Sequence, residues 1–280
     1  MILGNVLDPM PSSRGRVIPP TELGELEAFR SLLAGQAQAE IGGAVCLGFE
    51  RTPGSALFNR ALGLGLGEAA TEAGLEEIDA FFTERGLAYG IPLTPDAQPP
   101  ELPAWLEARG FHRGYAWTKF ARGPEPAPRI GSDLRVEELE ADRADVFADV
   151  FARAYGTPEV ARPLLERLPG SEGWRCFAAF DGGTPAAVGG LFVTDGVGWL
   201  GAAGTLPEFR RRGAQGALLA ARIEAGREVG CETLVTETGE PVDGRPGGSY
   251  RNIVRAGFEP VYVRQNYLSS EQGDTSGTRA

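Results

Sequence analysis

The chain has 280 residues, enough for one large domain or two of ordinary size, and its 42% hydrophobic content can supply substantial cores. A formal net charge of −11 argues against general nucleic-acid binding and favours a cationic partner such as an amine. The first 20 residues lack the basic region of a signal peptide, and no run of 18 apolar residues could span a membrane. We therefore expect a soluble, cytoplasmic protein, whose oligomeric state the sequence does not indicate.

The cysteines and the histidine exclude several kinds of catalytic site. Cys46, Cys176 and Cys231 are an odd number without a CxxC pair, and each lies in an apolar run typical of a strand. We predict that all three are buried free thiols. His112 is the only histidine, so catalytic triads and histidine-based metal sites have little support, and we predict no metal site.

The first half of the chain alternates helices and strands. Apolar residues at helical spacing predict helices over about 21–32 and 75–82, and a short helix ends at Gly110. Strands are predicted at 43–50, 55–67 and 87–91. Gly63, Gly65 and Gly67 do not complete a dinucleotide-binding fingerprint, because Glu68 stands where its third glycine belongs, so we interpret them as strand glycines.

The second half begins with a strand and two helices, continues as an antiparallel meander, and ends with a strand, loop, helix and strand. This order predicts a mixed, mostly antiparallel sheet in an α+β fold of three α/β/α layers. The predicted elements are a strand at 134–137, helices at 141–154 and 158–168, meander strands at 174–180, 186–193 and 197–205, a helix after Gly216, and a strand at 233–238.

The loop from Arg210 to Gly216 is the strongest chemical signal in the sequence. It places three consecutive arginines and two glycines before the N-terminus of a predicted helix. A helix N-terminus leaves about four backbone N–H groups unpaired and carries roughly half a positive charge, so it binds phosphate groups well. Glycines let the backbone approach such an anion, and the arginines add charge and bidentate donors. The loop fits neither the P-loop nor the GxGxxG pattern.

Together with a second motif, this loop resembles the GNAT acyl-CoA N-acyltransferases. Arg210-Arg211-Arg212-Gly213-Ala214-Gln215 occupies the family's Arg/Gln-x-x-Gly-x-Gly/Ala signature, with Gln215 in place of the last small residue. The stretch from Ser249 to Phe258 is similar to the family's last helix, which ends in Gly-Phe. The resemblance covers about residues 132–268.

The resemblance implies that acetyl-CoA is the co-substrate and identifies the residues that would bind it. The strand before the loop would offer backbone groups to the pantetheine arm, the loop would bind the pyrophosphate, and polar residues of the last helix could reach the pantetheine. These predicted residues are Gly204, Thr205 and Leu206, then Arg210, Arg211, Arg212, Gly213, Ala214, Gln215 and Gly216, and finally Ser249 and Asn252.

The resemblance also implies a general base and a proton donor. Glu237, near the end of a predicted strand, is the first candidate for the base, and Glu240 and Asp243 are alternatives. The family often has a tyrosine four residues before the final helix's glycine, but here that position is Ile253. Tyr250 could protonate the leaving thiolate instead, or the thiolate could leave without assistance.

The two halves of the chain end alike. Ala108–Phe120 aligns without gaps to Arg255–Tyr267, and each stretch reads as helix, Gly-Phe and strand. We therefore predict two tandem GNAT-like domains, followed by a disordered polar tail. The predicted boundaries are 21–120 for a degenerate first copy, 121–131 for a proline-rich linker, 132–268 for the acetyltransferase domain, and 269–280 for the tail.

The first copy has lost the charge of the anion loop, because Glu68 and Glu72 stand where the second copy has arginines. We therefore expect one acetyl-CoA site per chain. The resemblance implies an N-acetyltransferase in which the amine of a small molecule attacks acetyl-CoA directly in a ternary complex. The alternative is a non-catalytic acyl-CoA-binding or scaffold module, suggested by Ile253.

Overall fold

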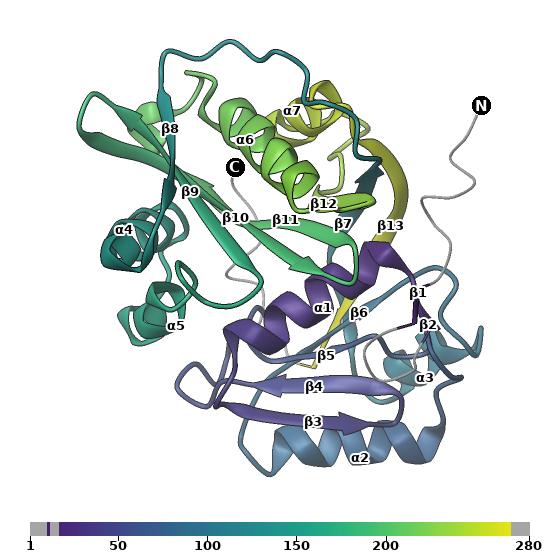
Figure 1. Ribbon diagram of the computed structural model, residues 1–280. Coiled ribbons are helices and arrows are strands. Elements are labelled where there is room, and N and C mark those ends of the chain that lie inside the picture. The colour runs from purple at the N-terminus through teal and green to yellow at the C-terminus, as the bar shows by residue number, and fades with distance from the viewer. Residues whose placement is uncertain (1–9, 12–16, 270–280) are drawn as a thin grey trace. The chain divides into compact units, whose positions relative to one another are not determined.

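The structure is a computed structural model that describes residues 10–11 and 17–269 (Figure 1). Its fold is α+β, with mixed but mostly antiparallel strand pairing, as the sequence predicts. The chain forms two compact units. We call the unit formed by residues 120–237 and 241–260 the C-terminal unit. The N-terminal unit contains the described residues up to 119, together with 238–240 and 261–269.

The N-terminal unit packs its helices against a sheet with the strand order β3-β4-β5-β6-β13-β7, and a short β1–β2 hairpin precedes them. Its helices are α1 (Pro20–Leu32), α2 (Glu72–Thr83) and α3 (Leu102–Ala108). Its strands are β1 (Met10–Pro11), β2 (Val17–Ile18), β3 (Ala37–Ile41), β4 (Ala44–Gly48), β5 (Arg60–Leu62), β6 (Gly90–Leu93), β7 (His112–Arg122) and β13 (Glu259–Leu268).

The C-terminal unit has the strand order β12-β11-β10-β9-β8. Figure 1 shows α4 and α5 on one face of its strands β9 to β11, and α6 and α7 on the other. Its strands are β8 (Arg135–Leu139), β9 (Trp174–Asp181), β10 (Thr184–Thr194), β11 (Val197–Thr205) and β12 (Thr233–Gly239). Its helices are α4 (Ala144–Tyr155), α5 (Arg162–Glu166), α6 (Ala214–Glu228) and α7 (Gly248–Arg255), with 3-10 turns at Ala141–Arg143, Glu159–Ala161 and Pro207–Phe209.

The two units repeat one sequence of elements. In the N-terminal unit, β5, a loop and α2 lead to β6, which pairs parallel to β5; in the C-terminal unit, β11, a loop and α6 lead to β12, which pairs parallel to β11. The α3 and α7 helices then end in the same way. Gly110 and Gly257 follow them with φ of 86° and 84°, left-handed values that glycine adopts without steric cost. The predicted duplication is therefore present in the fold.

The last strand does not stay with the elements that precede it in the chain. β13 follows α7, but its residues Gln265 to Leu268 pair antiparallel with Leu93 to Gly90 of β6 in the N-terminal unit. The compact units therefore differ from the predicted domain boundaries at residue 261, where the chain returns to the N-terminal unit. Apart from Ser269, the predicted disordered tail lies outside the described residues.

One predicted strand of the first half is wrong in its bounds. The strand predicted at 43–50 is β4, which forms a hairpin with β3, a strand that was not predicted. The strand predicted at 55–67 is only the three-residue β5. Gly63 and Gly65 are not strand glycines, because their φ values of 79° and 74° place them in the loop before α2. A Cβ on Gly65 would lie 2.6 Å from the carbonyl oxygen of Gln98, so the loop packs too closely there for any other residue.

A buried charge cluster joins α1 to three strands of the N-terminal unit. The Glu25 carboxylate is 2.8 Å from Arg60 of β5 and from Lys119 of β7, and 2.5 Å from Arg264 of β13. Glu22 also pairs with Arg264, at 2.6 Å. All five side chains are at most 6% exposed. The amphipathic pattern of α1 predicts its apolar face but gives no sign that these glutamates are buried as well.

Candidate functional site

The predicted anion loop opens the longest helix of the C-terminal unit. The N-cap residue of α6 is Gly213, which has a φ of 79° and no side chain that could cap the first N–H groups of the helix. The first backbone N–H groups of α6 therefore keep the hydrogen-bonding capacity and the positive end of the helix dipole that bind anions.

The three arginines of the loop have different surroundings. Arg212 donates two hydrogen bonds to Asp181, at 2.6 and 3.1 Å, and another to Asp133. These hydrogen bonds lower the pKa of both aspartates. Arg210 and Arg211 are exposed and form no ion pair with any residue that the structure describes. Two guanidinium groups are thus available to a ligand, whereas the third holds the loop to its neighbours.

The linker before β8 lies against the first turn of α6. A Cβ on Gly213 would lie 2.7 Å from the carbonyl oxygen of Gly131, and one on Gly216 would lie 2.5 Å from the Ile130 side chain. Ser132 donates a hydrogen bond of 3.0 Å from its hydroxyl to the Arg212 carbonyl. The chain's own packing thus requires both glycines, in addition to any approach by an anion.

Gln215, the departure from the family signature, connects α6 to α7. Its side-chain amide donates to the Ser249 hydroxyl at 2.7 Å and accepts from the Asn252 amide at 2.8 Å. Ser249 and Asn252 are thus brought together with the loop, as expected for residues of one site. Their described contacts fix the orientation of Gln215, and with it the relation between the two helices.

β11 and β12 separate where the family resemblance places the pantetheine arm. They pair at only three positions, the last being Trp199 with Val235, although β11 continues to Thr205. Directly after the Trp199–Val235 pair, the Thr236 side-chain hydroxyl donates a hydrogen bond of 2.7 Å to the Leu200 carbonyl, in place of a further backbone pair. Beyond this point Gly204 and Thr205 are partly exposed. Leu206 is buried, and its N–H donates to Ala186 of β10 at 3.0 Å.

The exposed end of β11 contains a bulge. Val188 pairs with Gly204 and Gly190 with Gly201, so β11 has one more residue than β10 across this interval. Ala202, within the bulge, has a φ of 44°, which is uncommon for a residue other than glycine. A bulge redirects the backbone groups beside it, so this strand presents carbonyl and N–H groups that regular pairing would otherwise use.

Arg222 of α6 forms hydrogen bonds to the backbone at the bulge. The Arg222 guanidinium donates hydrogen bonds to the carbonyls of Gly190 and Gly201, at 3.1 and 3.3 Å. Arg222 is 1% exposed. Burial lowers the pKa of Arg222 to about 10. Arg222 is not among the site residues predicted from the sequence. Its signal was a charged residue on a helix face that is otherwise apolar, with Leu218 and Ala225 beside it.

Tyr155 of α4 lies on the other side of the bulge. Its hydroxyl donates to the Ala203 carbonyl at 2.5 Å, and its side chain is half exposed. A Cβ on Gly204 would lie 3.0 Å from the Tyr155 ring, so the glycine makes room for it. Tyr155 is not among the predicted site residues, because no local pattern connects it with a strand 48 residues away.

The predicted base and acid lie in different environments. Both carboxylate oxygens of Glu237 accept from the Trp199 indole N–H, at 3.2 and 3.1 Å, at the point where β11 and β12 separate. The Tyr250 ring packs edge-on against Phe120, with 4.9 Å between ring centroids. Ile253, at the family's tyrosine position, is 2% exposed in the core. The alternative bases Glu240 and Asp243 are exposed, on the segment after β12.

The sequence profile of the acetyltransferase (GNAT) family matches residues 141–244, which contain β9 to β12, the anion loop and α6. This segment of the chain is therefore similar in sequence to the GNAT acetyltransferases. No curated protein matches its sequence.

Solved structures share the fold over most of the chain. A GCN5-related N-acetyltransferase from Kribbella flavida is 19% identical with a TM-score of 0.63, and the match covers 89% of this chain and 95% of that one. A GCN5-related N-acetyltransferase from Sphaerobacter thermophilus is 15% identical with a TM-score of 0.60, covering 81% and 76%. A tandem GNAT protein from the clavulanic acid biosynthesis pathway is 18% identical with a TM-score of 0.51, covering 77% and 75%. The tandem arrangement thus has a structural precedent.

The N-terminal GNAT-like copy closes the position that is open in the second copy. At the start of α2, the Thr71 hydroxyl accepts a hydrogen bond of 3.0 Å from the N–H of Gly74. The N–H of Ala70, just before it, donates to the Gln98 carbonyl at 2.8 Å. An internal cap thus occupies the helix end that an anion would need, and Glu68 and Glu72 add negative charge nearby.

Two further observations concern all the residues that the structure describes. Within residues 10–11 and 17–269, no three His, Cys, Asp or Glu side chains are grouped so that they could hold a metal ion. The helices in the same part of the chain are too short or too polar to cross a membrane.

Proposed function

We propose that this protein transfers the acetyl group of acetyl-CoA to the amine of a small molecule, by direct attack in a ternary complex. The observation that carries the proposal is the N-terminus of α6, which has no side-chain cap and has Arg210 and Arg211 without ion-pair partners among the described residues. An anionic group of the size of a pyrophosphate satisfies both features. The net charge of −11 favours a cationic amine as the acceptor.

The residues of the loop have different roles in this proposal. The backbone N–H groups of Gly213 to Gly216, with Arg210 and Arg211, bind the pyrophosphate. Arg212 is a positioning residue, because its guanidinium is held by Asp133 and Asp181. Ser249 and Asn252 act through Gln215, whose amide they fix. The partly exposed backbone of Gly204 and Thr205 pairs with the pantetheine arm.

Glu237 is the base in this scheme. The Trp199 indole N–H holds its carboxylate beside the separation of β11 and β12, which keeps a proton acceptor close to the exposed backbone of β11. When the amine nitrogen attacks the thioester carbonyl, a proton passes from that nitrogen to Glu237. The carbon–sulfur bond then breaks, and the amide product and the CoA thiol are released.

The proton that the CoA sulfur takes up has two possible donors on this chain. Tyr250 is the one predicted from the sequence, and its ring belongs to the packing around Phe120. Tyr155 is the second, because its hydroxyl bonds to the bulged strand that we propose for pantetheine binding. The half exposure of Tyr155 and its bond to Ala203 favour it over Tyr250.

One observation favours a second function, a module that binds acyl-CoA without catalysis. Ile253 fills the core at the family's proton-donor position, so no tyrosine is available there. The two functions differ in turnover. Incubation of the full chain with acetyl-CoA and a panel of primary amines, with CoA release followed by a thiol reagent, separates them. We expect release that depends on one or more amines. CoA binding without amine-dependent release would instead support the binding module.

A further inference from the structure

A cavity of about 180 Å³ lies between α2 and α3 of the N-terminal unit. Its walls are the buried apolar parts of Leu75, Tyr89, Leu106 and Phe111. The Tyr89 and Phe111 rings meet edge-on, with centroids 5.3 Å apart, and Phe82 stacks on the far side of Tyr89 at 3.9 Å. The cavity thus has a rigid aromatic wall.

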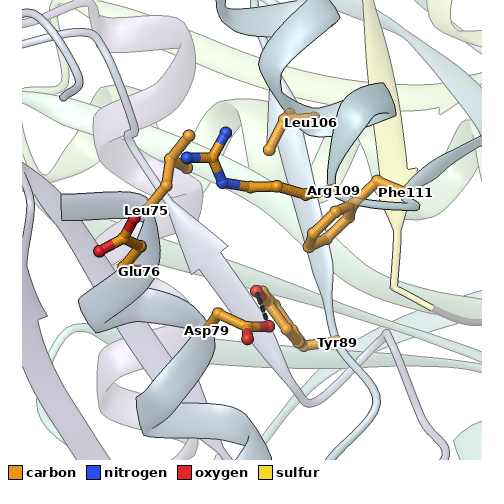
Figure 2. Close-up of a pocket in the computed structure, with 7 residues that line it drawn as sticks. All are labelled: Leu75, Glu76, Asp79, Tyr89, Leu106, Arg109 and Phe111. Carbon is orange, nitrogen blue, oxygen red and sulfur yellow. Dashed lines mark hydrogen bonds between the residues drawn. The ribbon is translucent and has the colours of Figure 1, made fainter. Parts of the chain in front are cut away.

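Charged side chains surround its opening. Figure 2 shows Arg109 reaching from α3 towards Leu75 and Glu76 of α2, and the Tyr89 hydroxyl bonded to Asp79 at 3.2 Å. Burial and the neighbouring Asp79 raise the pKa of Tyr89, so its hydroxyl keeps its proton at neutral pH. The remaining lone pairs of the Asp79 carboxylate are available to a ligand.

The negative charge at this opening is not balanced. The Arg109 guanidinium is already paired with Glu72 of α2, at 3.0 Å. The Glu76 side chain is exposed and forms neither an ion pair nor a hydrogen bond with any residue in the described part of the chain. The carboxylates that line the cavity are Glu76 and Asp79, and its one guanidinium is already paired with Glu72, so the opening attracts a cation.

In the second copy of the repeat, the corresponding junction is the contact between α6 and α7, and apolar side chains fill it. In the alignment of the two copies, Arg109 corresponds to Ala256 and Phe111 to Phe258. Ala256 and Phe258 are 0% and 1% exposed, and they pack with Ile253 and Leu218 between α7 and α6. The fold can therefore close this junction completely. In the N-terminal copy the same junction is hollow and carries charged residues at its edge, which packing alone does not require.

We propose that this cavity is a binding site for a small organic ammonium ion with an aromatic or branched aliphatic body. The apolar body lies against Tyr89, Phe111 and the two leucines, where aromatic faces also attract a cation. The ammonium group pairs with Glu76 and Asp79. The site belongs wholly to the N-terminal unit and does not depend on the proposed acetyl transfer, so it can be tested in the absence of acetyl-CoA.

The test is a calorimetric titration of the full chain with 2-phenylethylammonium and isopentylammonium, and with neutral 2-phenylethanol, all without acetyl-CoA. Affinity near the millimolar range suits a ligand of about nine non-hydrogen atoms. Glu76→Gln and Asp79→Asn change exposed side chains and keep their shapes, so the fold should survive. Each should weaken ammonium binding about threefold, and the double variant about tenfold. Glu77→Gln, the next residue on α2, is the matched control and should bind as the unchanged chain does.

Three results would overturn the proposal. The first is that neither ammonium ion binds saturably at concentrations up to about ten times the expected millimolar Kd. The second is that 2-phenylethanol binds as tightly as 2-phenylethylammonium. The third is that the double variant binds the ammonium ions as tightly as the unchanged chain. The acetyltransferase assay is a separate measurement, so loss of this site would leave the proposed function standing.

Discussion

Gly213 and Gly216 illustrate how one residue type serves packing and function together. The sequence predicts that they let an anion approach, but the linker residues Gly131 and Ile130 already occupy the space that their side chains would need. Gly213 also has a left-handed φ of 79°. A bulky residue at Gly213 would therefore distort the loop, and its effect on CoA affinity would not isolate anion binding. Arg210 and Arg211 offer a cleaner test.

Replacing both Arg210 and Arg211 by alanine should weaken CoA binding about tenfold at low salt, with a smaller difference at high salt. The reason is that the two exposed guanidinium groups contribute charge and donors to the pyrophosphate but no packing. Calorimetry measures the affinity for CoA. The control is Arg227→Ala, which removes an arginine from the last turn of α6, the helix that follows the loop. Equal CoA affinity in the double variant and the control would remove both arginines from the site.

Tyr155→Phe and Tyr250→Phe form a matched pair for the proton donor. If Tyr155 protonates the leaving thiolate, Tyr155→Phe should lower kcat by about 10²–10⁴-fold while CoA affinity stays the same. Tyr250→Phe should then keep its activity, because it removes a hydroxyl and leaves the ring against Phe120. The reverse pattern would assign the role to Tyr250, and full activity in both would mean that the thiolate leaves unaided.

The three thiols should be inert in the native protein. Cys46, Cys176 and Cys231 are free and buried, as predicted from the sequence. Burial raises the pKa of Cys46 to about 12 and that of Cys231 to about 11, and it raises the pKa of Cys176 as well. A thiol reagent at pH 8 should modify them only after the protein unfolds. Rapid modification of the folded chain would show that one of them is accessible.

At the scale of elements, the periodic segments are the ones that the sequence predicts well. The strands of the β9, β10 and β11 meander are nearly continuous apolar runs separated by turns at Gly182 and Gly196, so they were placed within a residue or two. β5 was predicted too long because its glycines fit a strand as well as a turn, and only the contact of Gly65 with Gln98 distinguishes the two. A local sequence pattern cannot predict a contact between residues that lie so far apart in the chain.

The same limit explains which residues of the candidate site were missed. The loop, Gln215 and the polar residues of α7 are marked by a motif, and the structure brings them together. Tyr155 and Arg222 have no motif, because their partners are carbonyl groups of β10 and β11 that any residue could supply. Their roles depend on the bulge in β11, which the sequence does not reveal.

The charge cluster on α1 gives a prediction for this element. Burial alone would raise the pKa of Glu25, but Arg264, Lys119 and Arg60 hold it well below its usual value of 4.5. Because the folded pKa is the lower one, the stabilisation is fully present above pH 4.5 and is lost as the pH falls towards the folded value. Glu25→Gln should destabilise the protein by about 3–5 kcal/mol near neutral pH.

Denaturant unfolding between pH 3 and 7 checks this prediction. The variant should lose less stability than the unchanged chain as the pH falls below about 4.5, since it lacks the titrating group. Glu27→Gln, on the partly exposed side of α1, is the control and should change stability by less than about 1 kcal/mol. Parallel pH profiles for the Glu25 variant and the unchanged chain would contradict the assignment.

At the scale of the whole molecule, the position of β13 connects the two copies. This strand follows α7 of the C-terminal unit, yet it pairs with β6 and supplies Arg264 to the charge cluster of the N-terminal unit. A chain that ends at Pro260 should therefore lose a strand and leave Glu25 with one cation fewer. We expect it to be unstable, with a lower melting temperature or no cooperative transition. Unchanged melting would show that β13 is dispensable.

The two copies have also divided their chemistry. α6 begins with a glycine at its N-cap, beside two arginines that form no ion pair with a described residue, whereas Thr71 caps α2 and two glutamates lie nearby. We therefore infer that a single anion-binding helix N-terminus in each chain accepts CoA.

Calorimetric titration of the full chain with CoA tests that claim most directly, because it reports stoichiometry and affinity together. We predict one CoA site per chain. The double variant with Arg210→Ala and Arg211→Ala should bind CoA more weakly, and Thr71→Ala in the N-terminal copy should leave the affinity for CoA unchanged. Two sites per chain, no binding, or a loss of affinity in the Thr71 variant alone would contradict it.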